Sequence, residues 1–205
     1  MRRELKSVLA ALIVVASFAS LQAADEVSLR WALAARPDAE GELVPVREDT
    51  QLGAGTQMKF LVEPIAAGAV YLVFLDSSDQ AHVLYRGAAD GDAAEPTYIP
   101  AGRGWFELDA SAGLETFFLI AAEAPLADLD QLLDALEGGA DNSGEIVAEI
   151  RKLHRAHRDF AKAVEKPMMI GGRRRGGPDE DEAIDRLALE VAADGFYAKT
   201  ITIEH

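Results

Sequence analysis

The sequence predicts a mainly β, α+β fold: an antiparallel β-sandwich of about eight strands, with an insertion of two to three helices before the last strand. Three observations lead to this fold class. Short segments with alternating apolar residues recur between Val27 and Ala122, separated by turn-forming residues. From Leu126 the apolar residues are spaced by three and four, as in an amphipathic helix. Alternation returns from Phe196 to Ile203.

Residues 1–23 have the pattern of a signal peptide. Arg2, Arg3 and Lys6 provide a positive start and Val8–Ala19 an apolar segment, so we expect cleavage after Ala23. The alternative is an uncleaved anchor, but a membrane-spanning helix needs about 20 apolar residues. The chain then divides into a signal peptide (1–23), a β-sandwich domain (24–125), a helical excursion (126–194) and a final strand returning to the sheet (195–205).

Charge and cysteine content narrow the function classes. The formal net charge of −15 becomes more negative without residues 1–23, which disfavours nucleic acid and anionic lipid as partners. The chain has no cysteine, which excludes disulfides, thiol catalysis and a lipid-modified cysteine. Together with the signal peptide, these features predict a bacterial protein that is periplasmic or secreted, with no membrane span after cleavage.

The first three predicted strands are 27–33, 42–47 and 58–63. Pro45 lacks the amide hydrogen for a ladder bond, so we place the second strand at an edge or a bulge. Turns are expected at 36–41 and 52–56, where proline or glycine favours a change of direction. The third strand is expected to end at Pro64.

A hairpin follows these strands. Ala69–Asp76 is rich in β-formers, Ser77–Gln80 is a polar turn, and Ala81–Tyr85 alternates again. We interpret this hairpin as the centre of the fold, with most other segments packed around it. An exposed loop is expected at 86–95.

Three further strands precede the helical segment. They are expected at Thr97–Pro100, Gly104–Leu108 and Glu115–Ala122. The last of them is apolar almost throughout, which is typical of a central strand.

The helical excursion is expected to contain a short helix and then the longest helix. Leucines at 126, 129, 133 and 136 form one face of the first, which ends at Gly138-Gly139. Asn142 and Glu145 have the spacing of a capping box and open the second, over residues 144–165. Pro167 is expected to stop it.

A third helix is expected after a glycine- and arginine-rich loop at 171–177. Pro178 and the acidic residues 179–182 favour a helix start, because carboxylates there face the positive end of the helix dipole. Its apolar face is expected to include Ile184, Leu187, Ala188 and Val191, with a break at Asp194-Gly195.

The order of several short motifs supports a family resemblance. The motifs are, in order, Leu52-Gly53 with Gly55, Val70-Tyr71-Leu72-Val73, Asp76-Ser77-Ser78-Asp79, Leu84-Tyr85, Tyr98-Ile99-Pro100, Gly113-Leu114-Glu115 and Pro125-Leu126. This order resembles the bacterial family called domain of unknown function 4384. Arg86 and Asp79 depart from it, because members usually carry proline and glycine there. The resemblance implies an exported, mainly β accessory module and provides no catalytic residues.

Two histidines are the candidate metal ligands. His154 and His157 lie three residues apart on a predicted helix, a spacing that lets both contact one ion, with Glu149 or Asp159 as a further ligand. The alternative is a packed histidine, His157, beside a solvated one. Asp141–Glu145 has some features of a calcium loop, but its glycine is misplaced and the distal glutamate is absent.

Hydroxyl and carboxylate candidates fall in predicted turns. Ser77, Ser78 and Ser111 lack the Gly-x-Ser-x-Gly context of a nucleophile, so we interpret them as turn formers. Asp76 and Asp79 are a possible carboxylate pair, but are better explained as shaping the hairpin turn.

Three charged or aromatic groups remain. The run Arg173–Arg175 is either a site for an acidic partner or a solvated loop. The basic helix face of Arg151, Arg155, Arg158 and Lys162 is either an anion site or, as we prefer, pairs with Asp128, Asp130 and Asp134. Tyr98, Trp105 and Phe106 form either a ligand patch or part of the core.

These observations favour an exported, non-enzymatic accessory module of the bacterial envelope that binds another envelope protein. No catalytic residue, metal or cofactor is assigned. One alternative is a metal-assisted hydrolase that uses His154 and His157. Another is a carrier that holds a small apolar ligand inside the sandwich.

Overall fold

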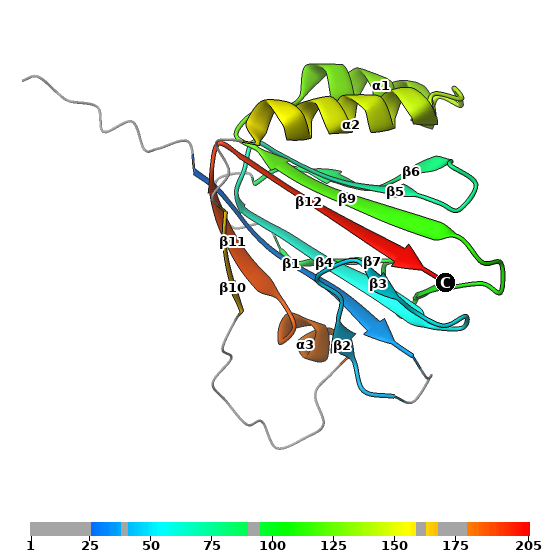
Figure 1. The fold of residues 1–205 in the computed structure, drawn as a ribbon. Helices are drawn as coiled ribbons and strands as arrows, with labels where there is room; N and C mark the ends of the chain where they lie inside the picture. Colours follow the sequence, from blue (N-terminus) through cyan, green and yellow to red (C-terminus); the bar gives the residue numbers. More distant parts are fainter. Residues whose placement is uncertain (1–25, 38–40, 90–94, 159–162, 168–179) are drawn as a thin grey trace, which may run out of the picture.

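The protein is described by a computed structural model, which covers residues 26–37, 41–89, 95–158, 163–167 and 180–205. Two β-sheets pack face to face, and helices cover the outer face of each (Figure 1). The predicted β-sandwich with helices inserted before the last strand is therefore confirmed. The predicted signal peptide, residues 1–23, lies outside the described residues.

The first sheet has the strand order β10-β11-β1-β4-β7, with β2 beside β1 and β8 beside β4. All its pairings are antiparallel. Its strands are β1 (Glu26–Arg36), β2 (Val44–Pro45), β4 (Gln57–Ala66), β7 (Thr97–Ile99), β8 (Phe106–Glu107), β10 (Val164–Pro167) and β11 (Leu189–Asp194).

The second sheet has the strand order β3-β12-β9-β5-β6. Its pairings are antiparallel except the short one between β12 and β3. Its strands are β3 (Thr50–Gln51), β5 (Ala69–Leu75), β6 (Ala81–Gly87), β9 (Leu114–Ala122) and β12 (Phe196–Glu204).

The main core fills the space between the sheets. Alternate residues of each strand enter it, such as Trp31 and Leu33 of β1 opposite Phe117 and Leu119 of β9. The rings of Phe60 and Phe117 lie 4.8 Å apart, an aromatic contact across the two sheets. This core ties the strands of both sheets into one unit.

Two smaller apolar clusters lie outside the sheets. Helices α1 (Ala127–Glu137) and α2 (Ser143–His157) cover the second sheet through Leu129, Leu133, Ile146 and Ile150. Helix α3 (Glu180–Asp185) covers the first sheet through Ile184. Strands such as β1, β4 and β9 are therefore buried on both faces, which explains their nearly continuous apolar sequences.

Two glycines at one end of the sandwich allow the chain to cross between the sheets. Gly195, at φ 69°, joins β11 of the first sheet directly to β12 of the second. Gly68 lies between β4 and β5, and a Cβ atom there would come within 2.0 Å of the Glu123 carbonyl oxygen. The Glu123 amide in turn donates to the Gly195 carbonyl oxygen. Both crossings thus meet at one tightly packed corner.

The predicted hairpin exists, but its position differs from the prediction. β5 and β6 pair from Leu75 and Ala81 outward, as expected from the sequence. However, β6 is an edge strand, and β9 occupies the middle of the sheet between β12 and β5. The prediction of Glu115–Ala122 as a central strand is confirmed, and so is the return of the last strand to the sheet. The edge position predicted for Pro45 is also confirmed, since β2 pairs with β1 alone.

The helical excursion is shorter than predicted. Helix α2 ends at His157, and Val164–Pro167 forms strand β10 rather than the end of a helix. Helix α3 ends at Asp185, and Val191 belongs to strand β11. The described part of the segment 126–194 therefore holds three helices and two additional strands of the first sheet. The predicted loop at 171–177 lies outside the described residues.

The start of α2 is in the predicted place but is capped differently. Asn142 is the N-cap residue, yet its side chain makes no capping hydrogen bond. Its Nδ2 instead donates to the Leu132 carbonyl oxygen of α1. Ser143 accepts a hydrogen bond from the Ala81 amide of β6. These side chains fasten α2 to its neighbours instead of forming a capping box.

No helix among the described residues is long and apolar enough to span a membrane.

Candidate functional site

The outer face of the first sheet carries a group of cations beneath α3. The β1–β4 register pairs Arg30 with Glu63, Ala34 with Lys59, and Arg36 with Gln57. Residues two apart on a strand share a face, so these side chains all project away from the main core. Helix α3 lies over this face, which brings its carboxylates to the cations.

Lys59 is the most unusual member of this group. Its side chain is 0% exposed, between the buried residues Met58 and Phe60 of β4. Its Nζ donates to the Gly102 carbonyl oxygen at 2.5 Å and lies 3.7 Å from Asp181 Oδ1. The rings of Trp105 and Tyr98 lie 5.6 and 5.9 Å away. An ammonium can donate three hydrogen bonds, and within the described residues only the one to Gly102 is made.

Arg36 lies beside Lys59 and is held from three sides. One terminal nitrogen donates to Glu180 Oε1 at 2.9 Å, and the other to Gln57 Oε1 at 2.8 Å. The guanidinium carbon lies 4.3 Å from the Trp105 ring centroid, which is a cation–π contact. Its Nε is buried and has no hydrogen-bond partner in the described part of the chain.

Arg30 and Tyr98 form the far side of the network. Arg30 pairs with Glu63 and lies 3.6 Å from Asp185. The Tyr98 hydroxyl donates to Asp185 Oδ1 at 3.1 Å. Burial and the negative charge of Asp185 raise the pKa of Tyr98, so the hydroxyl remains a donor at neutral pH.

A hollow of about 640 Å³ opens beside these residues, and we call it the basin. Its lining consists of Arg36, Gln57, Gly102, Arg103, Trp105, Glu180 and Asp181. A guanidinium can bind a carboxylate through two parallel hydrogen bonds, and an indole ring can hold that guanidinium in place. The basin is therefore suited to hold an anionic group. Its present carboxylates come from α3.

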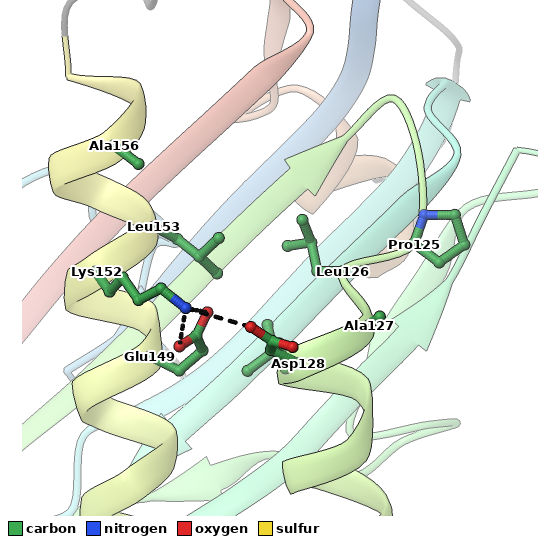
Figure 2. A pocket seen from close by; sticks show the side chains of 9 residues that line it. Pro125, Leu126, Ala127, Asp128, Glu149, Lys152, Leu153 and Ala156 are labelled. Atoms are coloured by element: carbon green, nitrogen blue, oxygen red, sulfur yellow. Dashed lines mark hydrogen bonds and ion pairs between the residues drawn. The ribbon is translucent and has the colours of Figure 1, made fainter.

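A second hollow of about 330 Å³ lies between the start of α1 and the end of α2 (Figure 2). Leu126 and Leu153 point into it. Lys152 Nζ bonds Glu149 of its own helix at 3.0 Å and Asp128 of α1 at 3.2 Å. This group of three charges links the two helices on the exposed side of the hollow.

The predicted histidine pair is divided by its surroundings. The His157 ring stacks on Phe196 of β12, with centroids 4.0 Å apart. The Nε2 atom of His154 is buried without a hydrogen-bond partner in the described residues, and burial lowers its pKa. Glu149 is engaged by Lys152, and Asp159 lies outside the described residues. Within the described residues, no group of three or more metal-ligating side chains is close enough to hold an ion.

The carboxylate and hydroxyl candidates of the hairpin lie in its turn, where Asp76 makes hydrogen bonds that shape it. Asp76 Oδ1 accepts hydrogen bonds from the amides of Ser78 and Gln80, and Oδ2 lies 2.9 Å from His82 Nε2. Burial alone would raise the pKa of Asp76, but these hydrogen bonds outweigh it and hold the pKa below its ordinary value. Asp79 adopts a φ of 60° at the tip. Ser111 donates its amide hydrogen to Asp109 in a separate turn.

The acidic residues of α1 have partners other than those predicted. Asp130 and Asp134 both pair with Arg86 of β6, and Asp128 pairs with Lys152. The predicted pairing with Arg151 and Arg155 is therefore wrong for the ion pairs of the described residues. Arg86 instead fastens α1 to the edge of the second sheet. Arg173–Arg175 and Lys162 lie outside the described residues.

The predicted aromatic patch is split between two places. Tyr98 and Trp105 lie together beside Lys59, outside the first sheet. Phe106 packs against the main core. Sequence reasoning missed Lys59, Arg30 and Arg36 as site residues. The available signal was that Lys59 shares its strand face with Leu61, and Arg30 shares its face with Ala32 and Ala34.

Comparisons with protein-family models, with curated proteins and with solved structures found no match. The resemblance to the family called domain of unknown function 4384 stays a prediction from the order of its motifs.

Proposed function

We propose that the chain is an exported, non-enzymatic binding module of the bacterial envelope, and that its basin receives acidic side chains of a partner protein. The partner class follows from the chemistry of the basin, which Arg36 and Arg103 line, with the buried Lys59 3.7 Å from the lining residue Asp181. Arg36 is paired with Glu180, and Asp181 lies 3.7 Å from Lys59, an arrangement that suits binding better than acid–base catalysis.

The observation that carries this proposal is the environment of Lys59. A buried ammonium with a single hydrogen bond carries a large desolvation penalty. An apolar residue of similar size would serve the sheet at less cost, because replacing buried ion pairs by packed apolar residues is often neutral or stabilising. We infer that Lys59 and its neighbour Arg36 are kept for their charge.

The net charge of the chain favours a short acidic segment over a long polyanion. At −15, the long-range field repels anions, so association depends on close contacts inside the basin. The rings of Trp105 and Tyr98 lie 5.6 and 5.9 Å from Lys59 Nζ and favour a cation at this position.

A titration with hexaglutamate tests the binding role. The chain has two tryptophans, Trp31 in the main core and Trp105 at the basin. In a nitrogen-15 NMR spectrum, hexaglutamate is expected to shift the indole signal of Trp105 and leave that of Trp31 in place. Hexaglutamine provides the uncharged control.

A pair of arginine variants locates the contact. Arg36→Gln is expected to weaken hexaglutamate binding by about tenfold, the loss of a charge-assisted hydrogen-bond pair. Arg155→Gln, on the exposed side of α2, is the matched control and should bind as the parent does. Equal shifts of both indoles, or equal affinity of the two variants, would contradict a specific basin.

Export has its own test. Expression of the whole chain in a bacterial host is expected to yield a periplasmic protein whose first residue is Ala24. Mass spectrometry of the periplasmic and membrane fractions distinguishes this from an anchor. A membrane-bound form that retains residues 1–23 would contradict the export proposal while leaving the basin untouched.

A further inference from the structure

The first turn of α3 already places two carboxylates against the basin. Glu180 Oε1 accepts from Arg36 at 2.9 Å, and Asp181 Oδ1 lies 3.7 Å from Lys59 Nζ. Both residues also line the hollow. Two adjacent acidic residues thus contact the two cations on which the proposed function depends.

The next turn of α3 is attached in a different way. Ile184 is fully buried against Ala32, Ala34 and Leu61 of the first sheet. Asp185 accepts a hydrogen bond from Tyr98 and pairs with Arg30. These contacts can hold the helix in place when its first turn opens.

Glu182 is an acidic residue of α3 that allows contacts in the basin to be distinguished from the overall negative charge of the helix. Its side chain pairs with Arg186 of its own segment at 2.8 Å and does not line the basin. Glu182 therefore has the same charge and the same helix as Glu180, with a different partner. It is a natural control position.

We propose that the first turn of α3 is an internal stand-in for the partner: Glu180 and Asp181 occupy the basin, and an acidic segment with two adjacent carboxylates replaces them. This inference rests on the proposed function of the basin. It names the chemistry of the partner, because a segment that replaces Glu180 and Asp181 has to satisfy Arg36 and Lys59 in the same way.

Release of the first turn requires little rearrangement. The side chains of Glu180 and Asp181 are 35% and 45% exposed, so water and salt already weaken both contacts. Short terminal turns open locally at low free-energy cost, since they are held by few buried contacts. Ile184, in the following turn, is 0% exposed and takes no part in these two contacts.

The test compares two forms of a synthetic peptide that carries the sequence of residues 178–186. One form keeps the two carboxylates, and the other carries Glu180→Gln and Asp181→Asn. Isothermal titration calorimetry measures binding of each to the whole protein, to its Glu180→Gln/Asp181→Asn variant and to its Glu182→Gln variant. Thermal unfolding of each protein by circular dichroism confirms that the variants are folded.

The expected result is that the double variant binds the acidic peptide about fivefold more tightly than the parent, because the internal competitor is gone. Glu182→Gln should bind as the parent does, and the amide form of the peptide should bind to none. Equal affinity of the parent and the double variant would contradict the proposal that Glu180 and Asp181 compete with the partner, and would leave the binding role intact. Binding of the acidic peptide to neither folded protein would overturn both.

Discussion

The two outer faces of the sandwich are covered by opposite kinds of contact. On the second sheet, α1 and α2 bury an apolar layer that includes Leu129, Leu133, Ile146 and Ile150. On the first sheet, α3 adds Ile184 and otherwise meets arginine and lysine with carboxylates. The apolar cover is held by a non-directional force that salt does not screen, whereas ion pairs at partly exposed positions weaken with salt. We therefore expect the helical layer on the second sheet to be a fixed part of the fold, and the attachment of α3 to the first sheet to weaken with salt.

The largest expected effect on stability comes from a substitution in the apolar layer between α1, α2 and the second sheet. Leu133→Ala removes a fully buried side chain between α1 and the second sheet. We expect the free energy of unfolding to fall by about 3 kcal/mol, from lost transfer energy and the remaining cavity. Urea denaturation measures it. Leu136→Ala, at a partly buried position of the same helix, should lose clearly less; equal losses would show that the layer is not specifically packed.

The corresponding substitution in α3, the helix that covers the first sheet, is Ile184→Ala. This side chain is also fully buried, but it is the only buried one within α3. We expect the free energy of local opening of α3 to fall by about 2 kcal/mol, with a smaller change in the global urea midpoint. Hydrogen exchange of the α3 amides reports the first quantity. A global loss as large as that of Leu133→Ala would show that both covers unfold with the sandwich.

Salt gives a smaller contrast without any substitution. At about 1 M sodium chloride the Debye length falls to about 3 Å, which screens the contacts of Glu180 and Asp181. Hydrogen exchange of the α3 amides is expected to accelerate about threefold, since such pairs are worth under about 1 kcal/mol each. The amides of α1 and α2 serve as internal controls and should accelerate less, because buried apolar residues hold these helices in addition to the ion pairs of Arg86 and Lys152. Uniform acceleration across all three helices would contradict the comparison.

The smallest expected effect is a change in the pH dependence of stability, caused by His154 in α2. Burial lowers the pKa of His154 in α2, so the unfolded chain takes up this proton more readily than the folded one. Its contribution to stability is present above the ordinary histidine pKa of about 6.5 and is lost as the pH falls toward the lower folded value. His154→Gln should therefore lose less stability than the parent between neutral and mildly acidic pH in urea denaturation. Parallel curves would contradict this account.

The sequence predicted most strands because their alternation has a simple physical origin in one buried face. The prediction failed where the same apolar residues fit both the spacing of a helix and the alternation of a strand. Ala188 and Val191 suit a helical face that continues from Ile184, yet Leu189, Val191 and Ala193 alternate inward in β11. These residues form a strand because β11 pairs with the edge of β1, and this pairing satisfies the backbone hydrogen-bonding groups of β1. All four residues of β10 are exposed, so its sequence has no period to detect.

The basin was beyond sequence reasoning because it depends on register. Lys59 and Arg36 become neighbours only through the pairing of β1 with β4, and Glu180 reaches them from more than a hundred residues away. Alternation in β4 predicted that Lys59 faces away from the main core, which is correct. It carried no information that α3 would bury that face.

The corner at Gly68 and Gly195 limits where this chain can accept new sequence. Both crossings have contact-distance packing around the Glu123 backbone, so an added residue at either would displace the ends of β5, β9 and β12 together. The hairpin tip at Ser77–Gln80 is exposed and remote from that corner. A fused domain or affinity tag therefore belongs at the tip, where the lengthened loop would leave both sheets in register.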